Sequence, residues 1–252
     1  MKKVVIAVDS FKGCLSSSDI AKAVAEGIHH VIPGCEVIKV PIADGGEGTV
    51  EALTQATHGQ VITIPVHNPF MQPIQASYGI TGDGQTAVIE MSAASGLDLI
   101  PRKEGNVMHT TTYGTGELIA DAVDRGCRNF IIGVGGSATN DAGVGMMQAL
   151  GVRFTDDNGN EVEKGGKVLS AICHIDTRSQ LPELSACTFH IATDVTNPFF
   201  GPQGAAHIFG PQKGGNEMQV EALDKGMKHL AGLILETTGR DISNLPGAGA
   251  GG

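Results

Sequence analysis

The chain has 252 residues, of which 41% are hydrophobic and 17% charged, and its formal net charge at pH 7 is −10. This composition is typical of an ordinary globular protein with one large or two small domains. The acidic balance argues against a nucleic-acid-binding protein, because such proteins need a basic face. If this chain binds phosphates, then local lysines, backbone amides or a metal ion have to compensate for its negative charge.

The apolar runs and the cysteines suggest a cytoplasmic protein. No apolar run approaches the length of a membrane span, and the run at the N-terminus is too short for a signal peptide. The five cysteines are scattered and include no Cys-x-x-Cys pair, which favours reduced thiols over disulfides or a zinc site. We therefore expect no membrane contact.

The N-terminal quarter predicts an alternation of strands and helices. Residues 3–8 are rich in valine and isoleucine, as in a buried parallel strand, and Ser16–Ser18 offer N-caps for a helix that ends at Pro33. Strands at 37–42 and 61–66 flank a second, shorter helix. This order predicts an open parallel sheet with its site outside the carboxyl ends of the strands.

The pattern changes near Pro65, where we expect a domain boundary. Two β-rich runs, at 74–81 and 85–91, flank Asp83-Gly84, a dipeptide that is typical of hairpin turns. Further along, the hydrophobic periodicity indicates a helix at 116–125, strands at 130–134 and 189–192, and a long amphipathic helix with its apolar face from Val220 to Leu235.

A glycine-rich turn, Gly135–Gly145, follows the strand at 130–134 and precedes a further helical run. The first backbone N–H groups of a helix have no intrahelical partner and carry the positive end of the helix dipole. Such a turn is therefore a natural anion site. Glycine lets the backbone approach the anion, and Ser137, Thr139 and Asn140 add short polar side chains.

Three other turns share this composition: Asp9–Gly13, Asp44–Thr49 and Asp194–Gly214. Each combines glycine with an acid, a lysine or a hydroxyl. Phosphoryl transfer needs such groups: amides and lysines on phosphate oxygens, carboxylates on Mg²⁺, and a base near the accepting hydroxyl. Neither a P-loop nor a dinucleotide-binding glycine motif follows the first strand. Together, the four turns predict a phosphate-handling enzyme.

Each turn also has a plainer interpretation. Asp44 could cap a helix after a tight turn, Lys12 could be a solvated surface lysine, and Asp194 could form an Asx turn. The nine histidines lie apart without an H-x-x-x-H pair, and Ser10 and Ser137 lack the elbow motif of serine hydrolases. No single motif decides the question, whereas the concentration of four does.

In these motifs the chain resembles the bacterial type-1 glycerate kinases, over its whole length and in the family's order. The motifs are Asp-Ser-Phe-Lys-Gly at 9–13, Ala-Asp-Gly-Gly-Glu-Gly-Thr at 43–49, Ile-Glu-Met-Ser-Ala-Ala-Ser-Gly-Leu at 89–97, Gly-Thr-Gly-Glu-Leu at 114–118, Gly-Gly-Ser-Ala-Thr-Asn-Asp at 135–141, Asp-Val-Thr-Asn-Pro at 194–198, Phe-Gly-Pro-Gln-Lys-Gly at 209–214 and Pro-Gly-Ala-Gly-Ala at 246–250.

The resemblance implies ATP-dependent phosphorylation of D-glycerate, usually at the 2-hydroxyl, with Mg²⁺. It also implies an α/β fold: a Rossmann-like parallel-sheet domain, incomplete here, and a second α/β domain with a mixed sheet inserted into it. The site is expected between the two domains. The domains would comprise residues 1–65, residues 66–240, and residues 241–252 as the start of the return to the first.

Charge suggests the roles of the motif residues. Lys12 and Lys213 would neutralise the glycerate carboxylate or the transferring phosphate. Asp44 and Asp194 would hold Mg²⁺ or accept the glycerate proton, with the choice between these roles left open. The other expected ligand-binding positions are Ser10, Gly45, Gly46, Glu47, Gly135, Gly136, Ser137, Thr139, Asn140, Asp141, Asn197, Gln212, Gly247 and Gly249.

The chain departs from the family pattern at its end, because family members continue well past the turn at 247–252. We therefore expect the first domain to be half a sheet with uncovered apolar faces, and the chain to be weakly active or inactive. Two alternatives stay open: a kinase for another small hydroxy acid, and a non-catalytic fragment that binds anions or nucleotides. D-glycerate and ATP are the expected partners, without nucleic acid or membrane, and a homodimer stays open.

Overall fold

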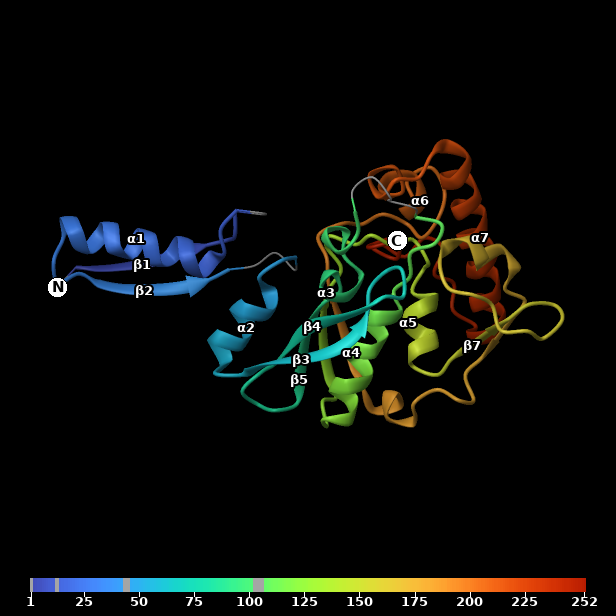
Figure 1. Ribbon diagram of the computed structural model, residues 1–252, viewed down its shortest axis with the longest axis horizontal. Helices are drawn as coiled ribbons and strands as arrows, with labels where there is room; N and C mark the ends of the chain where they lie inside the picture. The colour runs from blue at the N-terminus through green and yellow to red at the C-terminus, as the bar shows by residue number, and fades with distance from the viewer. Residues whose placement is uncertain (1, 12–13, 43–45, 102–106) are drawn as a thin grey trace.

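The chain begins with a small parallel unit. The computed structural model describes residues 2–11, 14–42, 46–101 and 107–252. In it, strand β1 (Lys3–Val8) pairs in parallel with strand β2 (Glu36–Pro41), and helix α1 (Ser17–Val31) connects them (Figure 1). Ser16 caps this helix, as its position predicted, by accepting a hydrogen bond from the Asp19 amide at 3.1 Å.

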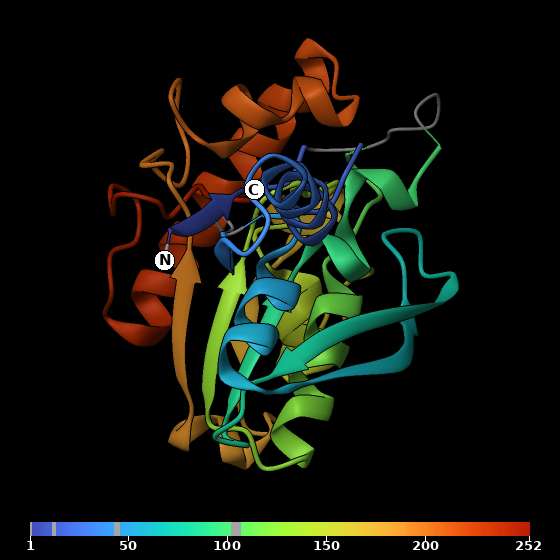
Figure 2. The same cartoon turned by 90° about the vertical axis from the view of Figure 1, so that its left-hand side faces the viewer.

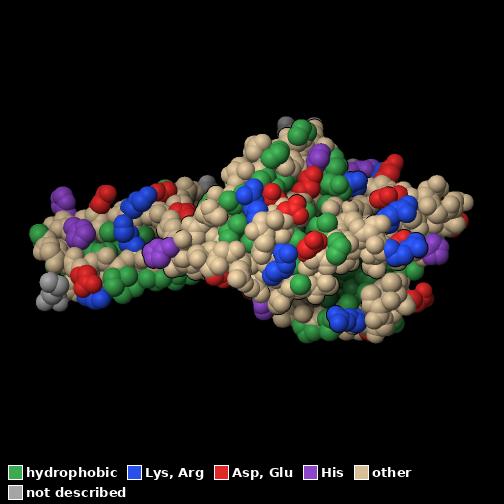
Figure 3. All heavy atoms as spheres, turned by 90° about the horizontal axis from the view of Figure 1, so that it is seen from below, with side chains coloured by type: hydrophobic (Ala, Val, Ile, Leu, Met, Phe, Trp, Pro, Cys, Tyr) green, Lys and Arg blue, Asp and Glu red, His purple; other side chains and the backbone are tan. Residues whose placement is uncertain are grey.

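Only one face of this two-stranded sheet is covered. Ile6 packs against Ala21 and Ala25 of α1, whereas Val5 is 57% exposed and Val40 is 41% exposed. The expectation of a buried strand at 3–8 is therefore wrong, because within the described residues a helix covers the sheet on a single side. Figure 3 shows hydrophobic side chains along this projecting unit.

The third predicted strand does not join this sheet. Strand β3 (Gln60–His67) pairs antiparallel with β4 (Pro73–Ile80) over its full length, so the expected three-stranded parallel opening is wrong. The short connection between β3 and β4 suits an antiparallel pair, since a parallel pair needs a long crossover. The sheets therefore change between β2 and β3, and the domain division at residue 65 stays a prediction.

The larger sheet has five strands in the order β3-β4-β5-β6-β9. Asp83 forms the predicted hairpin turn between β4 and β5 (Thr86–Glu90), where its carboxylate accepts hydrogen bonds from the Gln85 and Thr86 amides. Strands β5, β6 (Asn129–Gly133) and β9 (Thr188–Ala192) run parallel, whereas β4 runs against its neighbours. The expected α/β fold with a parallel sheet and a mixed sheet is confirmed.

Helices cover both faces of the mixed sheet. Alternate residues of a strand point to opposite faces, so neighbouring residues of β4 contact different helices. On one face, the buried Tyr78 donates its hydroxyl to Asp121 of α4 (Tyr113–Asp124) at 2.6 Å. On the other face, the neighbouring Gly79 lies against Thr54 of α2 (Thr49–Thr57). Burial and this hydrogen bond raise the pKa of Tyr78, so the phenol stays protonated.

A second core forms around the long helix α7 (Glu217–Thr238), which begins with a capping box at Asn216 and Gln219. Its predicted apolar face is buried from Val220 to Leu230, but Leu235 is exposed. No helix within the described ranges is long and apolar enough to cross a membrane. The remaining elements are α3 (Ser92–Ser95), η1 (Leu97–Leu99), α5 (Val144–Ala149), β7 (Arg153–Thr155), η2 (Gly166–Ala171), β8 (His174–Asp176), η3 (Pro182–Ala186), α6 (Ala205–Phe209) and η4 (Pro211–Lys213).

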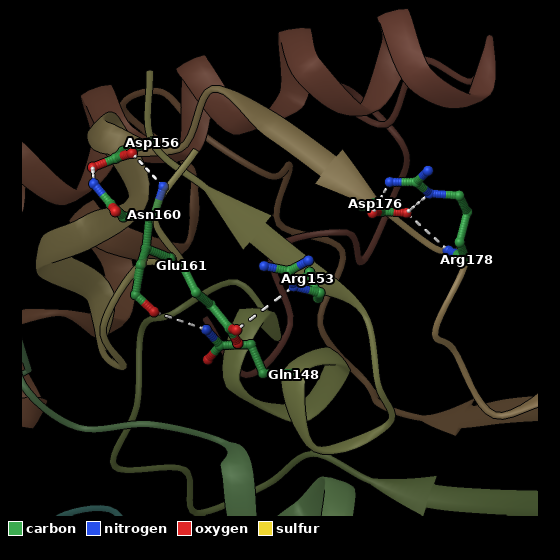
Figure 4. A network of polar contacts seen from close by, with 8 residues as sticks. Gln148, Arg153, Asp156, Asn160, Glu161, Asp176 and Arg178 are labelled. Atoms are coloured by element: carbon green, nitrogen blue, oxygen red, sulfur yellow. Dashed lines mark hydrogen bonds and ion pairs between the residues drawn. The ribbon is translucent and has the colours of Figure 1, made fainter. Parts of the chain in front are cut away.

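The polar network in Figure 4 lies around the small hairpin of β7 and β8. Arg178 pairs with Asp176 at 2.7 Å, and Arg153 lies 3.8 Å from Glu161. Solvated ion pairs of this kind contribute little to stability, because water screens the two charges. We therefore interpret the network as a surface support of the hairpin.

A glycine lets α4 and α5 approach each other closely, and this contact is testable. A Cβ on Gly116 would lie 2.4 Å from the Met146 carbonyl oxygen and 2.7 Å from the Ala149 Cβ. We expect Gly116→Ala to lower the free energy of unfolding by about 1–3 kcal/mol, although alanine is the better helix former. Gly232→Ala in α7 is the matched control, since nothing lies within 4 Å of that position. It should raise stability by about 0.5–1 kcal/mol in the same denaturant titration, and equal gains in both variants would contradict the packing argument.

Candidate functional site

Three parallel strands end side by side at one edge of the mixed sheet. Glu90, Gly133 and Ala192 are the last residues of β5, β6 and β9, and they are partners in the strand register. In Figure 2 the arrowheads of β6 and β9 point to this shared edge. The loops that follow the three strands therefore emerge next to one another, which is where open α/β sheets hold their ligands.

These loops line a polar cavity of about 650 Å³. Ser137 comes from the loop after β6, Asp194 from the loop after β9, and Lys213 from the η4 turn. Of the residues predicted from the sequence, those that line the cavity are Gly46, Glu47, Gly135, Gly136, Ser137, Asp194, Gln212 and Lys213.

The cavity carries more acids than cations. Glu47, Glu90, Asp98 and Asp194 line it, and Lys213 is the cation among the lining residues in the described part of the chain. The structure gives the exposed Asp194 carboxylate no hydrogen-bond or ion-pair partner within that part. Over the same residues, no three His, Cys, Asp or Glu side chains lie close enough together to hold a metal ion by themselves.

Lys213 is buried, with 1% of its surface exposed. Its Nζ donates hydrogen bonds to the Thr139 carbonyl at 2.5 Å and to the Gly251 carbonyl at 2.8 Å. Burial lowers the pKa of this ammonium group to about 7, although the nearby Asp141 carboxylate acts in the opposite direction. An ammonium group has three protons to donate, so one is left beyond these two carbonyls.

The turn at the end of the chain closes one wall of the cavity. The Gly251 carbonyl accepts the Lys213 hydrogen bond and a second one from the Ser137 hydroxyl at 2.7 Å. Gly251 has φ +78°, and a Cβ there would lie 3.2 Å from the Val134 Cβ. Glycine therefore meets two requirements at this position: a left-handed backbone and a close contact with the loop after β6.

The anion site expected at the start of α5 stays a prediction, but the first amides of this helix have partners within the protein. The Asp141 carboxylate itself accepts the Gly145 amide at 3.2 Å, and the Thr112 hydroxyl accepts the Met146 amide at 3.0 Å. The helix donors are thus already paired inside the protein. Thr139, Asn140 and Asp141 are fully buried behind the cavity instead of lining it.

Asp141 organises this buried region. Its carboxylate also accepts hydrogen bonds from the Thr111 hydroxyl at 3.1 Å and from the Thr112 amide at 2.8 Å. Burial raises the pKa of Asp141, while these donors act to lower it. The cost of burying the carboxylate is therefore offset by several hydrogen bonds.

Comparison with known proteins identifies the family. The family model described as "Glycerate kinase family" matches residues 4–252. The chain belongs to the glycerate kinase family. It is 48% identical over 250 residues to "Glycerate 2-kinase" of Escherichia coli (strain K12) and 47% identical over 250 residues to "Glycerate kinase" of Bacillus subtilis (strain 168). These alignments cover 99% of this chain, and 66% and 65% of the respective relatives, so the chain spans about two thirds of their length.

A solved structure supports the same assignment. A crystal structure from Salmonella typhimurium LT2, of a protein with the provisional name glycerate kinase 2, matches with a TM-score of 0.92 and 45% sequence identity. The match covers 100% of this chain and 67% of that one. The fold described above is therefore a fold of the glycerate kinase family.

Other residues that the resemblance to glycerate kinases had indicated are not in the described lining of the cavity. Lys12, Asp44 and Gly45 lie outside the described residues. Ser10 lies on the projecting unit after β1 and is absent from the described cavity lining. The other predicted positions are likewise absent from that lining.

The last turn contacts the loop after β9 through Asn197, Gly247 and Gly249. The Asn197 carbonyl accepts the Gly249 amide at 3.0 Å. A Cβ on Gly249 would lie 2.2 Å from the Pro198 carbonyl oxygen, and one on Gly247 would lie 3.3 Å from the Val195 carbonyl oxygen. These glycines therefore permit close packing of the last turn against the loop after β9.

Sequence reasoning missed four polar residues of the cavity. Glu90, Ser92, Asp98 and Thr193 line it but were not among the predicted site residues, although Glu90 and Ser92 belong to the family motif at 89–97. The sequence could have indicated Glu90, because this acid comes at the end of an apolar strand. Asp194 was predicted from a similar pattern. For Asp98 the sequence alone offers no comparable signal.

The buried role of Asp141 predicts a loss of stability upon mutation. Asp141→Ala would leave the donors of Thr111, Thr112 and Gly145 unpaired, at a cost of about 1–3 kcal/mol for each buried group. We expect the free energy of unfolding in a denaturant titration to fall by about 3 kcal/mol or more, and by less for Asp141→Asn. The control Asp124→Asn changes an exposed acid at the end of α4. An unfolding midpoint that is unchanged in Asp141→Ala would argue for a ligand-binding role instead.

Proposed function

We propose that this chain carries the active-site cavity of an ATP-dependent kinase that phosphorylates D-glycerate to 2-phosphoglycerate. The observation that supports this most strongly is the convergence of Ser137, Asp194 and Lys213, from three separate loops, on one cavity in a glycerate kinase fold. Phosphoryl transfer needs positioned anion-binding groups and carboxylates more than it needs covalent chemistry.

Lys213 is the group that we expect to attract the anionic ligand. The chain is acidic overall, so a carboxylate or phosphate in this cavity requires a local positive charge. Two carbonyls fix the Lys213 ammonium group, which leaves one proton for the glycerate carboxylate or a phosphate oxygen. Ser137 and the backbone of Gly135 and Gly136 form the adjacent wall.

Mg²⁺ fits the chemistry of the cavity. Its preferred ligands are oxygens, and it is commonly bound by one or two carboxylates together with substrate phosphates and water. Asp194 and Glu47 offer carboxylates, and Asp44 remains a candidate that lies outside the described residues. When bound, the ion would neutralise charge on the phosphates.

An acid is also needed to accept the proton of the glycerate hydroxyl. Asp194 and Asp44 are the candidates, and the assignment of the base and of the metal ligand between them stays open. The exposed Asp194 carboxylate has no hydrogen-bond or ion-pair partner among the described residues, so it is free to take either role.

Turnover tests the proposed function directly. ATP consumption by this chain would be coupled to an optical signal in the presence of D-glycerate, other small hydroxy acids and sugars, and the product would be distinguished as 2- or 3-phosphoglycerate by NMR. We expect weak turnover, with D-glycerate as the preferred acceptor and the 2-phosphate as the product. Another preferred acceptor would favour a different hydroxy-acid kinase, and calorimetric binding without turnover would favour a non-catalytic fragment.

Asp194→Asn tests the proposed role of that carboxylate, because it keeps the shape of the side chain and removes the charge. We expect kcat to fall at least tenfold, or by about 1.4 kcal/mol of transition-state stabilisation. Asp124→Asn serves again as the exposed control and should leave kcat unchanged. A decrease of less than tenfold in Asp194→Asn would exclude this residue as base or metal ligand.

The buried Lys213 predicts a pH dependence of glycerate binding. Glycerate stays ionised between pH 6 and 9, so the titration of the lysine should dominate. An anion binds the protonated form, and the pKa of the free site lies at about 7. The dissociation constant measured by calorimetry should therefore be lowest below pH 7 and rise above it, by up to about tenfold per pH unit. Lys213→Met should weaken glycerate binding at pH 6 and make the dissociation constant nearly independent of pH. If the variant and the unmutated protein show the same pH dependence, this role of Lys213 is contradicted.

A further inference from the structure

Glu90 is the acid at the end of β5, and it reaches a helix that begins 40 residues earlier in the chain. Its Oε1 accepts a hydrogen bond from the Val50 amide at 2.8 Å. Burial raises the pKa of this carboxylate, whereas the nearby amides of Val50, Gly48 and Thr49 act to lower it. The start of α2 therefore faces one side chain, to which the Val50 amide is hydrogen-bonded.

Among the described residues, no side chain of its own segment caps the start of α2. Gly48 occupies the N-cap position with φ +95° and makes no side-chain hydrogen bond. The first amides of a helix need partners, and an acid at this end also interacts favourably with the helix dipole. Glu90 supplies both from the neighbouring sheet.

The same contact fixes part of the cavity wall. Gly46 and Glu47 line the cavity immediately before α2, and Thr49 is tied to this turn by a hydrogen bond of 2.7 Å from its hydroxyl to the Gly46 carbonyl. Any shift of the first turn of α2 would therefore move Gly46 and Glu47. The acid that prevents such a shift lies in the mixed sheet, at the edge from which the other cavity loops emerge.

We propose that Glu90 is a positioning residue: it binds the first turn of α2 and thereby holds Gly46 and Glu47 in the wall of the cavity. The functional side of this inference rests on the proposed kinase activity. Glu90 acts through the α2 backbone, since its carboxylate is already hydrogen-bonded to the Val50 amide. Glu90 thereby occupies the N-terminus of α2, a position at which a helix could otherwise bind a phosphate group.

Two variants separate this role from a direct contact with the ligand. Glu90→Ala removes the acceptor, whereas Glu90→Gln keeps an acceptor oxygen of nearly the same shape and loses the charge. Glu51→Gln is the matched control, because Glu51 is an acid of the first turn of α2 whose side chain bonds Gln55 instead. Hydrogen exchange of the free chain and steady-state kinetics would be measured on all three.

We expect the amides at 46–50 to exchange at least tenfold faster in Glu90→Ala, and near the unmutated rate in Glu90→Gln and Glu51→Gln. We also expect kcat/KM to fall at least tenfold in Glu90→Ala and to be largely restored by Glu90→Gln. Unchanged exchange at 46–50 in Glu90→Ala would overturn the proposal. Equal kinetic losses in Glu90→Ala and Glu90→Gln would overturn it in favour of a direct charge effect. If the unmutated chain shows no turnover, the proposed function fails, and exchange at 46–50 still decides whether Glu90 positions this wall.

Discussion

The register of three parallel strands is the constraint on which the cavity depends. Because Glu90, Gly133 and Ala192 end β5, β6 and β9 at one level, the chain has to turn at the same edge three times. Each turn places polar residues there without a long loop. The antiparallel β4 and the covering helices serve mainly to stabilise this edge, with α4 on one face and α2 on the other.

Buried polar groups then keep the loops in place. Asp141, in the loop after β6, accepts a hydrogen bond from Thr112. Lys213 joins the η4 turn to the same loop through the Thr139 carbonyl. Unpaired, such groups would cost several kcal/mol. Paired, they favour one arrangement of the loops over others, because any alternative would leave a buried donor or acceptor without a partner.

The sequence predicted local structure better than it predicted pairing. The Asp83-Gly84 hairpin, the Ser16 cap and the apolar face of α7 as far as Leu230 follow from local chemistry, and the structure confirms them. The pairing partner of β3 could not be predicted in this way, because a hydrophobic pattern indicates that a strand exists but not which strand lies beside it. In the cavity, glycine-rich turns indicated Ser137, Asp194 and Lys213. The same patterns could not reveal that Asp141 points inward, since its donors at Thr111 and Thr112 lie about thirty residues away in sequence.

The carbonyl oxygen of Gly251 has a consequence for how this region changes shape. It accepts hydrogen bonds from Ser137 and from Lys213 at once, so three distant segments share a single acceptor atom. If that peptide unit moves, the hydrogen bonds from the Ser137 hydroxyl and from the Lys213 ammonium group therefore change at the same time. Loop rearrangements here should be concerted rather than independent, with the two donors gaining or losing their common partner together.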